Sequence, residues 1–298
     1  MLSSSTNLQG CRRTSAVTNS SRRSRSSRVF CESAQDSSSR GHRSVIVLPG
    51  LGNASRDYDD LVEDLESAGL TTKVVPVQRY DWLRNAAGLR DVKYWQGMLA
   101  PRPTVDWFLN RLDETVDSIK KETDGLPITL LAHSAGGWLG RIYMKDFGTA
   151  GIDRFVSLGS PHLPPPEGAE GVVDQTRGIL TFCNDNCPGA FHDEVEYVTI
   201  AGKLIKGAKI RGEGSVQQKI IGLGYQQVCG DCEAWGDGVV PLPAAHLEGG
   251  ENIDLEGVYH SPVGAVRSAN GGEEDSKKER LWYGSEGVLD KWIECING

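Results

Sequence analysis

One short stretch constrains the fold of this chain more than any other: a largely apolar run that ends in small residues around a single serine. Residues 128–132 have the composition of a buried strand, and the residues that follow begin a helical pattern, which we expect to continue to about Lys145. A strand that turns abruptly through a serine into a helix is typical of a nucleophile elbow. Ala132 and Gly136 flank Ser134 and are small enough for that turn, in the pattern Ala-x-Ser-x-Gly.

Short β-branched runs alternate with amphipathic stretches on both sides of this motif. The clearest helical stretch begins at Pro103 and Thr104 and has apolar residues three and four apart as far as Ile119, and a second is expected at 58–68. Such alternation is the pattern of a parallel sheet with helices on both faces, so we predict an α/β fold over residues 44–298. The expected strands are 44–48, 71–77, 128–132, 153–158 and 196–201.

A serine hydroxyl is a poor nucleophile without a general base, and the base needs an acid to fix its tautomer. Asp237 lies in the glycine-flanked segment Gly-Asp-Gly-Val-Val-Pro, and His260 follows 23 residues later. The order Ser134, Asp237, His260 is the one expected when the serine sits in such an elbow. Among the other histidines, His162 precedes the acid, and His246 is the second choice for the base.

Two backbone amides are candidate donors to an oxyanion. The Ala135 amide would lie at the N-terminus of the helix after the elbow, where free N–H groups and the positive end of the helix dipole stabilise negative charge. The second donor is expected in a loop after an early strand, and Pro49-Gly50-Leu51-Gly52 is such a loop, from which we select the Leu51 amide.

The N-terminal end differs in composition from the rest. The first 31 residues contain six arginines, nine serines and no acidic residue, and they lack the apolar core of a secretory signal, so they predict an organelle transit peptide. Val29-Phe30-Cys31 favours a plastid, with a mitochondrion as the alternative, and residues 32–43 read as a linker. An ordinary disordered tail is the other interpretation of this leader.

The whole chain has 298 residues and a formal net charge of −8, which argues against a nucleic-acid partner. No window has the roughly 18 consecutive apolar residues of a membrane span, so any membrane contact is expected to be peripheral. Nothing in the sequence reports on oligomeric state. The predicted chemistry requires no cofactor.

The simplest interpretation of Cys183, Cys187, Cys229 and Cys232 is that they are free thiols. A redox-sensitive disulfide between Cys229 and Cys232 is the stronger alternative, and a zinc site formed by all four cysteines is the weaker one.

The chain resembles lipase-type α/β-hydrolases, specifically plant plastid hydrolases related to GPI inositol-deacylases and to bacterial lipases. Five stretches carry the resemblance in order, and they are Leu48–Asn53, Ala132–Trp138, Leu158–His162, Gly236–Pro241 and Gly257–Pro262. The resemblance implies an α/β-hydrolase fold and a serine hydrolase of acyl esters, with Ser134 as nucleophile, Asp237 as acid and His260 as base. It also suggests that residues 203–235 are an insertion, because Asp237 lies well beyond the strand expected to end at Ala201.

Residues 161–193 contain three consecutive prolines and little periodicity, and they predict an excursion over the edge of the sheet that acts as a cap. Leu163, Ile179 and Phe182 in this segment are candidates to line an acyl pocket, and packing between cap and sheet explains them equally well. The expected substrate is a small-molecule or lipid ester. The alternatives are an acyltransferase or thioesterase that uses the same three residues, and a binding module in which they are dormant.

Overall fold

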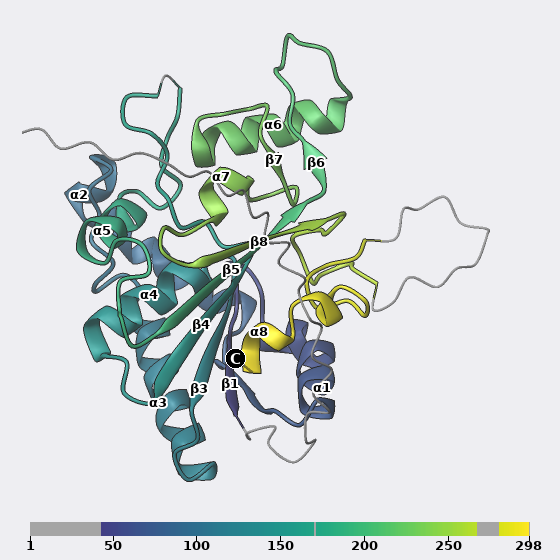
Figure 1. Ribbon diagram of the computed structural model, residues 1–298. Coiled ribbons are helices and arrows are strands. Elements are labelled where there is room, and N and C mark those ends of the chain that lie inside the picture. The colour runs from purple at the N-terminus through teal and green to yellow at the C-terminus, as the bar shows by residue number, and fades with distance from the viewer. Residues whose placement is uncertain (1–42, 170, 267–279, 298) are drawn as a thin grey trace, which may run out of the picture. The chain divides into compact units, whose positions relative to one another are not determined.

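The computed structural model describes residues 43–169, 171–266 and 280–297. Six parallel strands form one sheet in the order β2-β1-β3-β4-β5-β8 (Figure 1). The predicted α/β architecture is therefore confirmed. The predicted transit peptide (1–31) and nearly all of the predicted linker (32–43) lie outside the described residues. In this order the strands are β2 (Thr71–Val74), β1 (Ser44–Leu48), β3 (Ile128–His133), β4 (Ile152–Leu158), β5 (Glu196–Lys203) and β8 (Glu251–Glu256).

The sequence prediction missed one strand of this sheet and made another too long. The predicted strand 71–77 ends at Val74. The missed strand is β8, whose sequence ENIDLE has no β-branched run and whose residues are mostly exposed. Among the described residues it pairs only with β5, so there it forms the edge of the sheet. Charged side chains are common on such edge strands because they discourage pairing with other chains, and they also remove the apolar signal of a strand.

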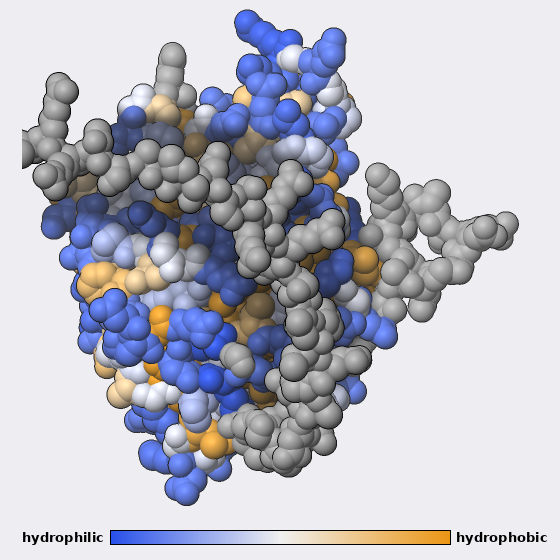
Figure 2. Space-filling model, viewed as in Figure 1, coloured by the Kyte–Doolittle hydropathy of each residue, from blue (hydrophilic) through white to orange (hydrophobic). Residues whose placement is uncertain are grey.

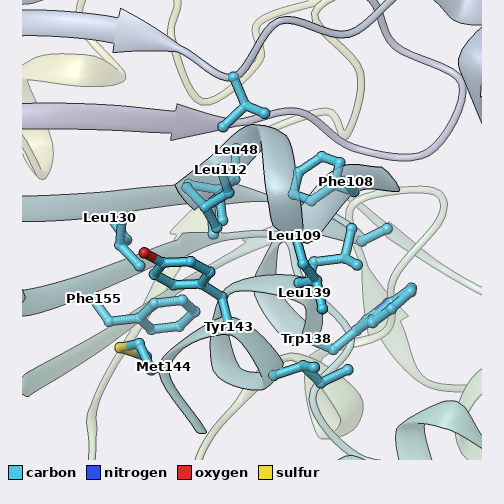
Figure 3. Packing of buried hydrophobic residues seen from close by; sticks show 14 of the residues in the cluster. Leu48, Phe108, Leu109, Leu112, Leu130, Trp138, Leu139, Tyr143, Met144 and Phe155 are labelled. Carbon is cyan, nitrogen blue, oxygen red and sulfur yellow. The ribbon is translucent and has the colours of Figure 1, made fainter. Parts of the chain in front are cut away.

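Alternate residues of the central strands enter two separate hydrophobic clusters, one on each face of the sheet. Ile46 and Leu48 of β1 belong to one cluster, and Val45 and Val47 belong to the other. The first face is covered by α3 (Asp106–Glu122), α4 (Gly136–Phe147) and α5 (Ile179–Asn186), and Figure 3 shows aromatic and leucine side chains of α3 and α4 packed against β1, β3 and β4. The second face is covered by α1 (Asp59–Ser67) and by the C-terminal segment with η3 (Leu289–Lys291) and α8 (Glu294–Asn297) (Figure 1).

The helix boundaries differ from prediction mainly at the N-terminal ends. Helix α3 begins at Asp106, because residues 102–105 form a turn before it, and α1 is preceded by the 3₁₀ turn η1 (Ser55–Tyr58). Between β2 and α3 the chain forms η2 (Arg79–Arg90) and α2 (Val92–Trp95), which were not predicted. The Asp81 carboxylate ties η2 to α3 through Arg111, at 2.7 Å, and this hydrogen bond lowers the pKa of Asp81 to about 2.

The segment predicted as an insertion, 203–235, lies outside the six-stranded sheet apart from Lys203. It contains β6 (Ile205–Lys206) and α6 (Val216–Cys229), and β6 pairs in antiparallel fashion with β7 (Trp235–Gly236). The short helix α7 (Leu242–Ala245) follows. The chain between β6 and α6 is mostly hydrophilic at its far end (top of Figure 2). Within the described residues, no helix is both long and apolar enough to cross a membrane.

The site is positioned by the order of the strands. From β1 the chain crosses to β2 on one side, and later returns to form β3 on the other side of β1. The loops after β1 and β3 therefore leave the sheet on opposite sides, and ligands of open α/β sheets bind at this kind of switch point. Leu48 is the register partner of Ala132, so the loop after β1 and the turn after β3 begin side by side.

Helix α4 packs on the sheet so closely that its first two positions must be glycine. A Cβ on Gly136 would lie 2.4 Å from the carbonyl oxygen of Leu48, and a Cβ on Gly137 would lie 2.4 Å from the Cβ of Ser160. Both distances are far below van der Waals contact, and one of them is to backbone, which cannot rotate away.

We therefore expect Gly136→Ala to lower the free energy of unfolding by about 1–3 kcal/mol, because the added methyl group overpacks the contact with β1. The matched control is Gly224→Ala in α6, where an added Cβ would meet nothing within 4 Å. That substitution should be neutral, or stabilising by up to about 1 kcal/mol, since alanine is the better helix former. Urea unfolding of both variants measures the difference, and equal midpoints would contradict the close packing.

Candidate active site

Ser134 sits in the left-handed region of backbone conformation, at the turn between β3 and α4. Its φ is 52°, a value that costs a residue other than glycine on the order of 1–3 kcal/mol. Two hydrogen bonds hold the turn: the Ser134 amide donates to the carbonyl of Leu158 at 3.0 Å, and the Gly137 amide donates to the carbonyl of Ser134 at 3.0 Å. The predicted strand, sharp turn and helix are therefore all present around this serine.

Three side chains that are far apart in the sequence form one hydrogen-bonded series. The Nε2 atom of His260 lies 3.1 Å from Oγ of Ser134, and its Nδ1 atom lies 2.7 Å from Oδ2 of Asp237. Asp237 is 1% exposed and His260 is 7% exposed, so the series runs from a buried carboxylate toward the accessible serine. Asp237 directly follows β7, and His260 lies beyond the end of β8. Each of these two residues therefore comes after a strand that the sequence did not predict.

The buried Asp237 carboxylate is stabilised by four hydrogen-bond donors. Oδ1 accepts from the backbone amides of Val239 and Val240, at 3.0 and 2.7 Å, and Oδ2 accepts from the Tyr283 hydroxyl at 2.8 Å in addition to His260. Burial and the nearby carboxylate raise the pKa of Tyr283, so its hydroxyl remains a donor. Sequence analysis missed Tyr283, because no motif marks a tyrosine 46 positions from its partner.

The two amides predicted as oxyanion donors lie in the turns that follow β1 and β3. The Asn53 amide donates to the carbonyl of Gly50 at 3.0 Å, and Gly52 has a φ of 79°, so residues 50–53 form a β-turn with Leu51 at its second position. The N–H at that position takes no part in the hydrogen bond of the turn. Among the described residues no acceptor pairs with the amide of Leu51 or of Ala135.

Gly50 permits the close approach of these two turns. A Cβ at this position would lie 2.8 Å from the Cβ of Ser134 and 2.9 Å from Nδ1 of His133. Any larger residue would push the loop after β1 away from the serine. Gly50 is therefore required by the close approach of this loop to Ser134 and His133.

No model of a known protein family matches the chain. One curated protein, uroporphyrinogen decarboxylase of Pseudoalteromonas atlantica, is 33% identical over 66 residues, which are 22% of this chain and 19% of that protein. This match is too short to assign a family.

Among solved structures, the lipase BlEst2 of Bacillus licheniformis in its propeptide form is 14% identical, with a TM-score of 0.51 over 89% of this chain and 52% of that one. The mature form of BlEst2 is 18% identical, with a TM-score of 0.47 over 74% of this chain and 84% of that one. The first likeness, together with the strand order and the turn at Ser134, decides the fold. The chain has an α/β-hydrolase fold.

The rival histidines of this α/β-hydrolase fold have partners elsewhere. Nε2 of His162 lies 2.8 Å from the Ser157 hydroxyl in the interior, and burial holds the pKa of His162 well below its usual value. Nε2 of His246 lies 2.9 Å from a carboxylate oxygen of Asp254. Neither histidine has a hydrogen bond to Ser134 among the described residues.

The three residues predicted to line an acyl pocket are placed differently. Leu163 is exposed, Phe182 is partly exposed with the Lys145 ammonium over its ring, and Ile179 is buried in the hydrophobic cluster under α4 and α5. Sequence analysis did not consider the side chains of three exposed apolar residues that lie close in sequence to groups of the site. Leu51 follows Gly50, Val239 follows Asp237 by two positions, and Val263 follows His260 by three.

The cysteines form no metal cluster with other ligands in the part of the chain that the structure describes. Cys183 and Cys187 are buried free thiols with their sulfur atoms 3.6 Å apart, and Cys229 and Cys232 are partly exposed free thiols. Sequence analysis gave a disulfide between Cys229 and Cys232 only as an alternative to free thiols, and both cysteines are free in this structure.

His133, the residue before the serine, is buried and neutral. Its Nδ1 lies 2.8 Å from the Tyr58 hydroxyl and its Nε2 lies 2.9 Å from the backbone carbonyl of His260. Burial, and to a lesser degree the neighbouring His260, lower the pKa of His133 to about 3. The other ionisable groups that face it are Asp237, which opposes this shift, and Tyr283, whose ring packs nearby.

This depressed pKa predicts a specific loss of stability in acid. Between about pH 6.5 and pH 3 the unfolded chain binds a proton at His133 that the folded chain does not, so the free energy of unfolding falls as the pH falls, by up to about 1.4 kcal/mol per pH unit from this residue. His133→Gln removes the titration. We therefore expect its urea-unfolding free energy to decline less steeply than that of the unsubstituted chain between pH 6 and pH 4. Parallel curves would contradict a buried, neutral His133.

Proposed function

We propose that the protein is a serine hydrolase that cleaves carboxylic esters, with Ser134, His260 and Asp237 as its catalytic residues. The observation that carries this proposal is the hydrogen-bonded series from the Ser134 hydroxyl through the His260 imidazole to the buried Asp237 carboxylate, at 3.1 and 2.7 Å. Both distances are within hydrogen-bond reach, which a nucleophile, its base and the acid that orients the base require. The α/β-hydrolase fold is a frequent setting for this chemistry, and the residue geometry, rather than the fold, supports the assignment.

The first half of the reaction forms an acyl-enzyme. Oγ of Ser134 attacks the carbonyl carbon of the ester while Nε2 of His260 takes the hydroxyl proton. Asp237 accepts a hydrogen bond from Nδ1 and stabilises the imidazolium that results. The C–O bond to the leaving alcohol then breaks, and the alcohol departs with the proton from His260.

The second half releases the acid. A water molecule attacks the acyl carbon, His260 takes its proton, and that proton returns to Oγ of Ser134 as the ester bond to the enzyme breaks. In both halves negative charge develops on the carbonyl oxygen, where the amides of Leu51 and Ala135 would donate. One such donor contributes roughly 3 kcal/mol of transition-state stabilisation. These steps involve no cofactor.

The acyl part of the substrate is proposed to be apolar, as in a lipid ester. Of the four segments that bear the catalytic and oxyanion groups, all except the turn at Ser134 also bear an exposed apolar side chain. These side chains are Leu51, Val239 and Val263, which are 63%, 48% and 51% exposed. Exposed apolar residues gathered around polar groups mark sites that bind apolar ligands.

The transit-peptide composition of residues 1–31 supports a plastid as the compartment.

We expect Ser134→Ala to abolish hydrolysis of a chromogenic ester and covalent labelling by a fluorophosphonate. Asp237→Asn should retain labelling at a much lower rate and lower kcat by about four orders of magnitude, because the wrong imidazole tautomer then predominates. The matched control is Ser118→Ala on α3, which should label and turn over like the unsubstituted chain. Labelling that persists in Ser134→Ala would reject the proposal, and turnover of thiol or alcohol acceptors in preference to water would indicate an acyltransferase.

The acyl preference is tested by chain length. We expect kcat/KM to be higher for an octanoate ester than for the acetate ester of the same alcohol. Leu51→Ser keeps the backbone amide and removes the apolar side chain. We expect it to reduce the ratio of kcat/KM for octanoate to kcat/KM for acetate by about tenfold or less, because about one kcal/mol of apolar contact is lost. The control is Leu83→Ser, which replaces another exposed leucine, in η2. A ratio unaffected by Leu51→Ser would exclude that side chain from the acyl site.

A further inference from the structure

Four buried groups form a continuous hydrogen-bonded series behind the proposed catalytic residues. The Gly50 amide lies 2.9 Å from the Tyr58 hydroxyl, which lies 2.8 Å from Nδ1 of His133, and Nε2 of His133 lies 2.9 Å from the carbonyl oxygen of His260. Tyr58 is fully buried and His133 is 2% exposed. The series connects the loop after β1 with the loop after β8. Its third member, His133, directly precedes Ser134 in the chain.

Only one arrangement of protons satisfies every member of this series. The carbonyl oxygen of His260 can only accept, so Nε2 of His133 carries the hydrogen. Neutral imidazole has one hydrogen, so Nδ1 carries the lone pair and accepts from the Tyr58 hydroxyl. The Tyr58 oxygen then has a lone pair for the Gly50 amide. Burial favours this uncharged state of Tyr58, because it raises the pKa of the hydroxyl.

The series fixes the orientation of both groups that it connects. The Gly50 amide is held by Tyr58 and the Gly50 carbonyl is held by the Asn53 amide. The C=O and N–H of a trans peptide point in opposite directions, so the bond from Asn53 to the Gly50 carbonyl sets the direction of the Leu51 N–H. The bond to Tyr58 holds the preceding peptide and with it the position of Gly50. At the other end, the His260 amide donates to the carbonyl of Asp237 at 3.1 Å and the His260 carbonyl accepts from His133, so the backbone that bears the base is held on both sides.

We propose that Tyr58 and His133 are positioning residues that hold the oxyanion donor of Leu51 and the base His260 in register with Ser134. This inference rests on the proposed function. Neither side chain touches the reacting atoms; each acts through the backbone of a residue that does. Misplacement of a catalytic group by about 1 Å lowers the rate on the order of 100-fold. We therefore expect the loss of either positioning residue to lower kcat rather than to weaken substrate binding.

Tyr58→Phe tests the proposal, because it removes only the hydroxyl and leaves the Gly50 amide and Nδ1 of His133 without partners. We expect kcat for a chromogenic ester to fall by about 10- to 100-fold with KM within about twofold of its original value. The matched control is Tyr143→Phe: Tyr143 is also buried, and its hydroxyl donates to Asp113 of α3 at 2.9 Å. Tyr143→Phe should leave kcat unchanged. A folded Tyr58→Phe enzyme with full kcat would overturn the proposal.

His133→Gln separates the two arms of the series. Its amide nitrogen can reach the position of Nε2 and donate to the His260 carbonyl, but it offers no acceptor at the position of Nδ1. We expect His133→Gln to retain more activity than His133→Ala, and Tyr58→Phe to lower kcat less in the His133→Gln background than alone, because residues that act as one unit are not additive. Equal activities of the two His133 variants, with additive effects of Tyr58→Phe, would contradict a connected series.

A measurement on the unsubstituted chain decides the proton arrangement even if the variants fail to fold. Nitrogen chemical shifts of ¹⁵N-histidine-labelled protein should show His133 as the neutral Nε2–H tautomer at pH 7 and still neutral at pH 5. A protonated ring or an Nδ1–H tautomer there would overturn the proposal. This result does not depend on turnover. If the protein neither hydrolyses esters nor reacts with a fluorophosphonate, the proposed function fails, but the tautomer of His133 still shows whether the hydrogen-bonded series has the proton arrangement given above.

Discussion

The left-handed backbone of Ser134 depends on close contacts that three glycines permit. Gly50 lets the loop after β1 approach the serine, and Gly136 and Gly137 let α4 begin directly against β1 and the segment that follows β4. A Cβ at any of these positions would lie within 2.9 Å of its nearest neighbour. Because the turn is tight, the serine hydroxyl, the start of α4 and the β-turn at Leu51 converge on one small volume. Every chemical property proposed for the site depends on this convergence.

The rest of the site satisfies buried polar groups with few charges. The Asp237 carboxyl group is buried, and four donors surround it, of which two are backbone amides. A buried carboxylate is tolerated only with such compensation. His133 and Tyr58, by contrast, remain uncharged because burial shifts both pKa values away from ionisation. The contrast separates Asp237, which is proposed to stabilise an imidazolium, from His133 and Tyr58, which are proposed to hold the backbone in place.

Local sequence was a reliable guide where a single segment contains the whole signal. Strand β3, the turn at Ser134 and helix α4 follow one another without a gap, and their apolar periodicity and small residues suffice to predict them. Strand β8 and helix α6 were missed for physical reasons. The edge strand β8 is mostly polar, and α6 has exposed Val216 and Ile220 and two glycines, so neither has the periodicity that marks a buried face.

The sequence by itself determined the α/β fold class, the elbow serine, and the order in which an acid and a histidine follow it, because these depend on residue type and on spacing along the chain. Only the tertiary structure decided which side chains surround them. Tyr58 is 75 positions from His133, and Tyr283 is 46 positions from Asp237. Hydrogen bonds between such distant residues leave no periodic trace in the sequence, since they form only after the sheet has brought the loops after β1, β3 and β8 to the same edge.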